Sequence, residues 1–159
     1  MLNTIKTLFF ACTMLFAITA VAQTQNEKDE AILKEYFKKN KIKATRTATG
    51  LYYVITKKGS GENAKKGQNV SMNYLGTFLD GKKFDGNIDE KYVSNRAPLN
   101  FTLGVGQVVV GWDEGIQLLN PGTRATLYLP SSVGYGPGGR GPIPPNTIMV
   151  FNVELLSAK

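Results

Sequence analysis

The sequence predicts an α+β fold in which one antiparallel sheet of five to six strands wraps around a single short helix. Between residues 48 and 159, short segments rich in aromatic and β-branched residues alternate with turn residues, which is typical of antiparallel strands. The chain holds 17 Gly, 7 Pro and 7 Tyr, which favours a β-rich fold with many tight turns. Only one segment of that region has helical periodicity. Because strands and one short helix cannot bury an apolar face unless the sheet wraps the helix, we expect a half-barrel.

Residues 1–22 have the pattern of a secretory signal peptide. Lys6 supplies the positive n-region, residues 7–21 are uncharged and apolar, and a small-x-small site at 20–22 precedes Gln23. The apolar run is short for a transmembrane helix. The pattern therefore predicts an exported, periplasmic protein.

Lipid anchoring through Cys12 remains the alternative. Ala11 provides the small residue that precedes the cysteine of a lipid-attachment site. Against this, the chain stays apolar up to Ala22, whereas lipoproteins normally turn polar after the modified cysteine. We therefore favour soluble export.

Residues 23–47 are expected to form a helical arm and a connector. Asn26 is the predicted cap of a helix that runs to about Asn40, with Glu27, Asp29 and Glu30 in its first turn. One apolar stripe follows from the helical spacing, and it consists of Ile32, Leu33, Tyr36 and Phe37. The stripe is expected to pack on the main domain, and the alternative is an arm for dimerisation or client binding.

Residues 48–159 contain the predicted strands. They cover 51–57, 70–78, 99–103, 124–129 and 148–156, and Asp80-Gly81 predicts a hairpin turn within 78–84. The helix is expected at 111–119, where Trp112, Ile116 and Leu119 share one face and Asn120-Pro121-Gly122 ends it.

Charge and residue usage exclude several kinds of chemistry. The formal net charge is +7, but the lysines are dispersed, and the densest group at 38–43 is interpreted as a solvated helix end, so no nucleic-acid partner is expected. The chain has no His, which rules out His metal sites, His general bases and Ser-His-Asp triads. The one Cys lies in the leader, so no disulfide, thiolate nucleophile, metal site or cofactor is expected in the mature chain.

The Gly-rich stretches 104–106 and 134–139 are interpreted as turns, because neither carries the Lys-Ser/Thr of a P-loop. The chain also contains a set of short phrases, which are Asn73-Tyr74-Leu75-Gly76, Asp80-Gly81-Lys82-Lys83-Phe84-Asp85, Phe101-Thr102-Leu103-Gly104, Val108-Val109-Val110-Gly111-Trp112-Asp113-Glu114-Gly115, Tyr135-Gly136, Ile143-Pro144-Pro145-Asn146 and Val150-Phe151-Asn152-Val153-Glu154-Leu155-Leu156. In this order and at about this spacing, the set resembles the FKBP-type peptidyl-prolyl isomerases over residues 49–157.

The resemblance implies an FKBP-like fold with a prolyl pocket between helix and sheet. By matching positions, Trp112 resembles the pocket floor, Tyr135 would offer its hydroxyl to a substrate carbonyl, the Val109 N–H would bind another, and Asp85 would lie in a polar network at the rim. The implied catalytic residues are Tyr74, Phe84, Asp85, Trp112, Tyr135 and Phe151, and the implied substrate-binding residues are Leu99, Val108, Val109 and Ile143.

Three departures from the family pattern bear on substrate preference and on affinity for macrolide inhibitors. Leu99 stands where family members usually have an aromatic residue. The stretch 86–96 is longer than in the minimal domain, and 137–142 is short and rich in Gly and Pro.

The function implied by the resemblance is isomerisation of Xaa-Pro bonds during folding of exported proteins. The expected partners are unfolded or partly folded polypeptides with exposed Xaa-Pro bonds, with macrolide inhibitors as further candidate ligands. The alternative is a non-catalytic binding module or a periplasmic holdase chaperone that uses the same pocket and the N-terminal arm.

Overall fold

The computed structural model describes residues 23–159. The predicted signal peptide at 1–22 and Cys12 lie outside the described residues. Within the described part, no helix combines the length and the apolar character needed to cross a membrane.

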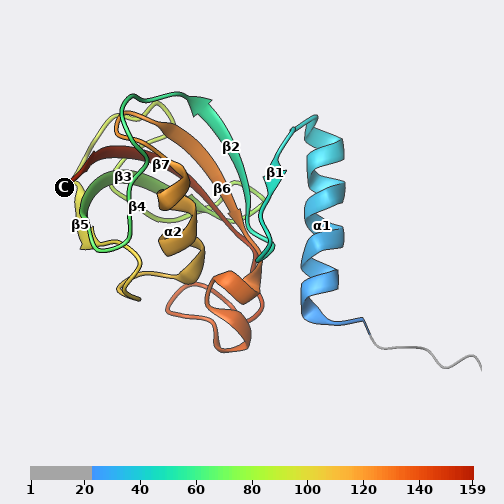
Figure 1. Cartoon of the computed structure of the whole chain (residues 1–159). Coiled ribbons are helices and arrows are strands. Elements are labelled where there is room, and N and C mark those ends of the chain that lie inside the picture. The colour runs from blue at the N-terminus through green and yellow to red at the C-terminus, as the bar shows by residue number, and fades with distance from the viewer. Residues whose placement is uncertain (1–22) are drawn as a thin grey trace, which may run out of the picture.

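One antiparallel sheet organises the domain, as the sequence predicts (Figure 1). Its strands follow the order β1-β2-β6-β7-β3-β4, and β5 pairs with the first half of β3 on the edge opposite β7, the edge that β4 also occupies. The two-residue β1 extends the sheet beyond the five to six expected strands. The strands are β1 (Thr45–Arg46), β2 (Tyr52–Lys57), β3 (Asn69–Thr77), β4 (Lys83–Gly86), β5 (Leu99–Thr102), β6 (Arg124–Leu129) and β7 (Met149–Ala158).

The predicted helix lies inside the curve of the sheet as α2 (Val110–Gly115), continued by the 3-10 turn η1 (Ile116–Leu118) (Figure 1). Trp112, Ile116 and Leu119 are buried together on its inner side. Glycines allow the helix to approach β6, because a Cβ on Gly111 would lie 2.6 Å from Leu129 Cγ. We call the apolar side chains between α2 and the sheet the inner cluster.

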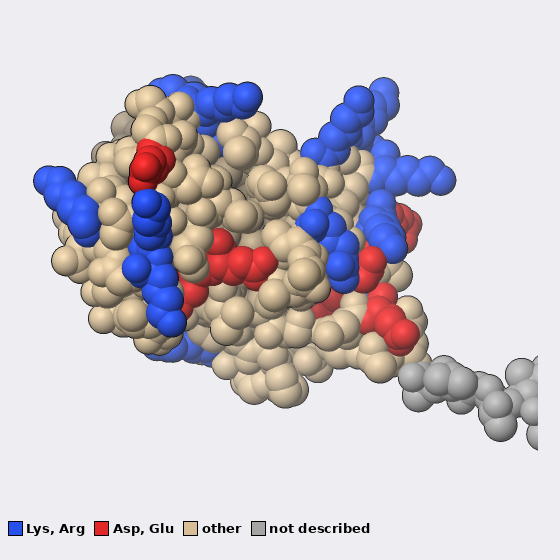
Figure 2. Space-filling model, in the orientation of Figure 1, with Lys and Arg blue, Asp and Glu red and all other residues tan. Residues whose placement is uncertain are grey.

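Helix α1 (Gln25–Asn40) stands on the other face of the sheet (Figure 1). Its N-cap is Thr24, two residues before the predicted Asn26. Thr24 Oγ1 accepts from Glu27 N at 3.3 Å, and Glu27 Oε2 accepts from Thr24 N at 2.7 Å. This reciprocal capping box satisfies two otherwise unpaired donors, which explains why Thr24 begins the helix rather than Asn26. In Figure 2, blue basic side chains project at the upper, C-terminal end of α1, where Lys38 and Lys39 lie in the last turn, as expected for a solvated helix end.

The apolar stripe of α1 packs on the sheet, as expected. Leu33 and Phe37 are buried, whereas the predicted stripe member Ile32 is 48 % exposed and does not take part. The cause is geometric, because Ile32 lies about 100° around the helix from Leu33. We call the buried set the outer cluster, and its members are Leu33, Phe37, Tyr52, Tyr128, Ile148 and Val150.

Asp29, one of the acids expected in the first turn of the helix, is buried against the main domain. It is 1 % exposed, and its Oδ2 accepts from Ser131 N at 2.8 Å and from Ser131 Oγ at 2.6 Å. Ser131 begins the 3-10 turn η2 (Ser131–Val133), which follows β6. The carboxylate therefore joins α1 to the start of the loop that continues through η3 (Gly136–Gly138).

Candidate functional site

A cavity of about 700 Å³ opens between α2, the sheet and the loops at one edge of the sheet. Every residue that the sequence analysis selected for the site lines this cavity. They are Tyr74, Phe84, Asp85, Leu99, Val108, Val109, Trp112, Tyr135, Ile143 and Phe151. The structure adds polar or turn residues that the sequence analysis did not select, and these include Gln107, Arg140 and Pro142.

The floor of the cavity is built from aromatic rings in edge contact. The Trp112 ring lies 4.9 Å from the Phe151 ring at 78° and 5.0 Å from the Tyr74 ring at 75°, measured between centroids. Phe84 meets Phe151 at 5.6 Å and 89°. These edge-to-face arrangements are the favoured aromatic geometry and fix the rings against one another.

Gly76 makes room for this arrangement. It pairs with Phe151 across β3 and β7. A Cβ at this position would lie 2.6 Å from Phe84 Cε2 and 2.8 Å from Phe151 Cε1. A glycine at this position of β3 is therefore required by the packing of the two rings above it.

Trp112 has an unusual polar feature for a floor residue. Its side chain is 5 % exposed, and within residues 23–159 its buried indole N–H has no hydrogen-bond partner. A buried donor without an acceptor is costly, so the aromatic packing of the floor must offset that cost.

Asp85 lies at the rim in a polar network. Its carboxylate accepts from Tyr74 Oη at 2.7 Å, from Gly86 N at 2.8 Å and from Arg96 Nη2 at 3.1 Å. Burial alone would raise the pKa of Asp85, but the Tyr74 hydroxyl, the Gly86 amide and Arg96 outweigh it, so the pKa lies below its usual value. Burial, together with the hydrogen bond to Asp85, raises the pKa of Tyr74 to about 12. At neutral pH the pair is a hydroxyl donating to a carboxylate.

Sequence reasoning missed Arg96, which lies in the stretch noted as longer than the minimal domain. The stretch folds back on the site because buried Asn87 holds it. Asn87 Oδ1 accepts from Tyr74 N at 2.8 Å, and its Nδ2 donates to Asn73 Oδ1 at 3.0 Å and to Ala97 O at 3.1 Å. In the sequence, Arg96 is marked only by its place at the end of a long loop. Its closeness to Asp85 depends on the hydrogen bonds of Asn87, which the sequence does not reveal.

Asp113 positions the segment in front of α2. Its carboxylate accepts from Gly104 N at 2.7 Å and from Gly106 N at 2.8 Å. The Gly-rich stretch 104–106 is thus a turn, as predicted, and it delivers Val108 and Val109 to the cavity. The chain is extended at Val109, which precedes α2, and its amide donates no hydrogen bond to a backbone or side-chain acceptor in the described chain.

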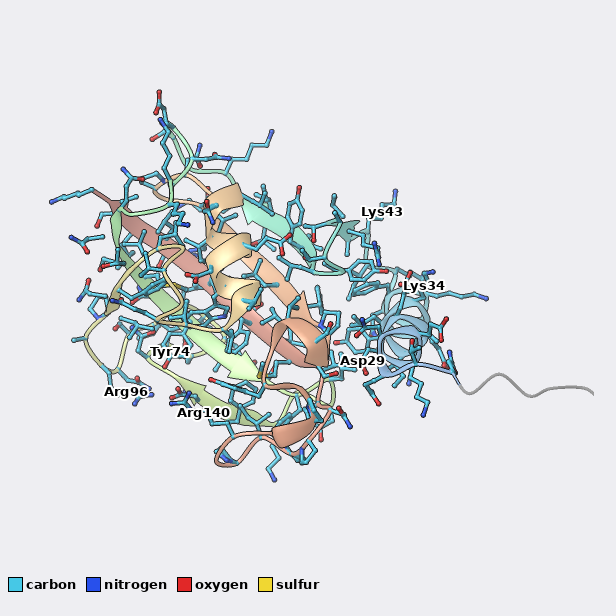
Figure 3. The ribbon with its side chains drawn as sticks, turned by 60° about the horizontal axis from the view of Figure 1, so that its bottom comes forward. Asp29, Lys34, Lys43, Tyr74, Arg96 and Arg140 are labelled. Carbon is cyan, nitrogen blue, oxygen red and sulfur yellow. The ribbon has the colours of Figure 1, made fainter. Side chains whose placement is uncertain are left out.

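The loop after β6 closes the cavity from the other side. Arg140 and Ile143 exchange two backbone hydrogen bonds of 2.9 Å across Gly141 and Pro142. The Arg140 guanidinium carbon lies 5.6 Å from the centroid of the Tyr135 ring, within the range of a cation–π contact. Figure 3 shows Arg140 and Arg96 on the same side of the molecule as Tyr74.

The arrangement is an aromatic floor with a hydrogen-bonding rim. Such a cavity can take an apolar ring against Trp112 and Phe151 while amide groups reach the rim. Among residues 23–159, no cluster of Cys, His, Asp and Glu side chains is placed to hold a metal ion.

The sequence model of the family described as FKBP-type peptidyl-prolyl cis-trans isomerase matches residues 60–156. The chain is 42 % identical over 138 residues to the FkpA protein of Neisseria meningitidis serogroup B, covering 86 % of this chain and 47 % of that protein. It is 39 % identical over 148 residues to the FkpA isomerase of Escherichia coli strain K12, covering 89 % and 52 %. The chain thus spans about half the length of these relatives.

A shorter relative and a solved structure agree with this result. The FK506-binding protein of Neisseria meningitidis serogroup B is 43 % identical over 108 residues, covering 67 % of this chain and 94 % of that protein. The crystal structure of FkpA from Escherichia coli superposes with a TM-score of 0.69 at 37 % identity, covering 83 % of this chain and 60 % of that chain.

Proposed function

The chain belongs to the family of FKBP-type peptidyl-prolyl cis-trans isomerases, and from this premise we propose that residues 48–159 catalyse rotation about Xaa-Pro amide bonds in the aromatic cavity. The observation that carries the proposal is the convergence of every selected residue, from Tyr74 in β3 to Phe151 in β7, on one cavity floored by Trp112.

Rotation about a prolyl amide faces a barrier of about 18–20 kcal/mol, because the C–N bond has partial double-bond character. In the twisted transition state that resonance is lost, so the carbonyl becomes less polar and the nitrogen gains a lone pair. Water solvates the planar amide better than the twisted one, whereas an apolar cavity favours the twisted state. A 1000-fold acceleration requires about 4 kcal/mol, which differential solvation and a held conformer can supply without breaking a bond.

Each part of the cavity has a proposed role. The proline ring packs on Trp112, with Tyr74, Phe84 and Phe151 as the aromatic catalytic walls and Leu99, Val108 and Ile143 as binding contacts. The Tyr135 hydroxyl and the Val109 N–H bind substrate carbonyls on either side of the twisted bond. Support for the second role comes from the Val109 amide, which has no acceptor within the described residues. Asp85 holds the Tyr74 hydroxyl through their 2.7 Å hydrogen bond and thereby orients the ring in the wall.

The test is a proline-isomerisation assay on the protein that begins at Gln23. We expect acceleration of cis–trans exchange in a short Xaa-Pro peptide, and a loss of at least tenfold in kcat/KM for Tyr135→Phe. Tyr36→Phe is the matched control, because it removes the same hydroxyl from the opposite face, where Tyr36 packs on Tyr128. A folded wild-type protein that gives no rate above background would refute the proposal.

The proposed substrates are exposed Xaa-Pro bonds in unfolded or partly folded chains. Macrolide inhibitors are proposed as competing ligands, since one relative is named an FK506-binding protein. Addition of a macrolide to the assay tests this directly, and an undiminished rate at saturating inhibitor would exclude it.

Export to the periplasm is also proposed, on the pattern of residues 1–22. Mass spectrometry of the protein expressed from the full sequence tests it. A mature N-terminus at Gln23 is the expected result, and a lipid-modified Cys12 at the N-terminus would establish anchoring instead.

A further inference from the structure

We propose that Arg140 is a specificity-determining residue that favours Xaa-Pro segments carrying a carboxylate beside the proline. The inference rests on the proposed isomerase function and names a substrate class for it. Apart from tyrosines, the ionisable side chains that line the cavity are Asp85 and Arg140.

The two charges differ in how they are compensated. Asp85 is paired with Arg96 at 3.1 Å and also accepts from the Tyr74 hydroxyl. For Arg140, no carboxylate in the described chain lies within 4.0 Å. With Asp85 already neutralised by Arg96, the rim of the cavity carries one uncompensated positive charge.

The position of this charge is held by the local structure. The backbone of Arg140 is fixed by its two hydrogen bonds to Ile143, with Pro142 restricting the turn between them. The side chain lies over the Tyr135 ring, whose face attracts a cation. Tyr135 and Ile143 both line the cavity, so these contacts hold the exposed Arg140 side chain at the cavity rim.

A guanidinium in this setting recognises a carboxylate with good geometry. Its planar array of donors can bind both carboxylate oxygens at once. The flanking residue of a substrate would enter from solvent and leave its charge at the rim, so the desolvation cost is small. Exposed pairs of this kind contribute modestly, and we therefore expect about a threefold preference, comparable to measured exposed ion pairs.

The test compares two peptides that differ only by Glu or Gln next to the proline, before it in one series and after it in another. The measured quantity is the ratio of kcat/KM for the Glu peptide to that for the Gln peptide. In Arg140→Gln this ratio should fall about threefold in at least one series, and in Arg140→Lys it should fall less, because the charge is retained. Salt at about 1 M, where the screening length is about 3 Å, should reduce the wild-type ratio toward that of Arg140→Gln.

Lys43→Gln is the matched control, since it removes the same charge from the connector that follows α1, well away from the cavity (Figure 3). It should leave both ratios and the basal rate unchanged. Equal ratios in wild type and Arg140→Gln in both series would overturn the inference, and so would an equal fall in Lys43→Gln, which would indicate net charge as the cause. Failure of the proposed function is distinguishable, because the wild-type protein would then fail to accelerate the neutral Gln peptides as well.

Discussion

Two aromatic clusters lie on opposite faces of the same sheet, and only one of them is open to solvent. Within one strand, neighbouring side chains point to opposite faces of the sheet and so belong to different clusters. Phe151 faces the inner cluster and Val150 the outer one, and Leu127 and Tyr128 divide in the same way. Both clusters use edge-to-face rings at about the same separation, 4.9 Å for Trp112–Phe151 and 4.9 Å for Phe37–Tyr128. An aromatic cluster is therefore not by itself a sign of a site.

The difference lies in the length of the covering helix. Helix α1 has 16 residues and extends about 24 Å. Helix α2 has 6 residues and η1 adds 3, which together extend about 15 Å. The 9 residues of β3 extend about 30 Å, so α2 covers only part of the inner face and leaves the rings beyond Trp112 exposed to a cavity. Four predictions separate the two faces.

The largest effect is expected on stability from the closed face. Phe37→Ala should lower the free energy of unfolding by about 3–5 kcal/mol, because it removes a buried ring between α1 and Tyr128. Urea denaturation measures it. The isomerase kcat/KM of the folded variant should remain within about twofold of wild type. This change is well below the tenfold change that about 1.36 kcal/mol would produce.

The control for this substitution is Ile32→Ala on the same helix. Ile32 is 48 % exposed, so its removal should change the free energy of unfolding by no more than about 0.5 kcal/mol. Equal destabilisation by both substitutions would contradict the assignment of Phe37 to a closed cluster.

The open face should show the reverse pattern. Trp112→Leu should lower kcat/KM by about tenfold to hundredfold, equivalent to about 1.4–2.7 kcal/mol of transition-state stabilisation. The assay is run on protein whose folding is verified by circular dichroism. Tyr128→Leu makes a similar change on the closed face, and comparable losses of activity in both variants would show that the open and closed clusters do not differ in function.

A third prediction concerns the link between the two faces. Asp29→Ala should lower the free energy of unfolding by about 2 kcal/mol, because it removes an acceptor from two donors of Ser131, which is 2 % exposed. Thermal or urea unfolding measures the change. Glu30→Ala, next to it on the helix, loses exposed pairs with Lys34 and Arg46 and a long, 3.5 Å hydrogen bond from Tyr52 Oη, and it should have a clearly smaller effect. If Asp29→Ala and Glu30→Ala lowered the free energy of unfolding equally, the buried carboxylate of Asp29 would have no anchoring role.

The smallest effect is a difference between two tyrosines. Burial raises the pKa of Tyr74 to about 12 with help from Asp85, and burial raises that of Tyr128 to about 12 with a contribution from Tyr36. Ultraviolet titration should therefore show Asp85→Asn lowering the pKa of Tyr74 and leaving that of Tyr128 unchanged. Tyr74→Phe and Tyr128→Phe identify the two signals, and a shift of both tyrosines in Asp85→Asn would contradict the assignment.

These shifts also set the sign of the pH dependence of stability. A tyrosine pKa that is higher in the folded state than the ordinary 10.0 contributes stability that is complete below pH 10.0 and is lost as the pH rises toward about 12. The lowered pKa of Asp85 acts at the other end. Its contribution is present above the ordinary value of 3.8 and disappears as the pH falls through the folded value.

The predicted elements were largely correct, and the errors have local causes. Strand β6 was predicted with its observed bounds, because its alternation is flanked by clear turn residues. The cap of α1 was predicted two residues late. Asn26 is a residue type that often caps helices, but Thr24 and Glu27 form a reciprocal pair that satisfies two backbone donors at once. Arg96 and Arg140 were not selected, because their contacts with Asp85 and Tyr135 depend on the conformation of irregular loops, which has no regular spacing in the sequence.

The sequence by itself determined the α+β fold, the order of its elements and the residues of the aromatic cavity, because alternation, turn residues and family phrases are local patterns. Tertiary structure alone decided which aromatic cluster stays open, since that depends on how much sheet each helix covers. It also decided the charge at the rim. A carboxylate and two guanidiniums have no fixed relation along the chain, and folding pairs Asp85 with Arg96 and leaves Arg140 beside the cavity.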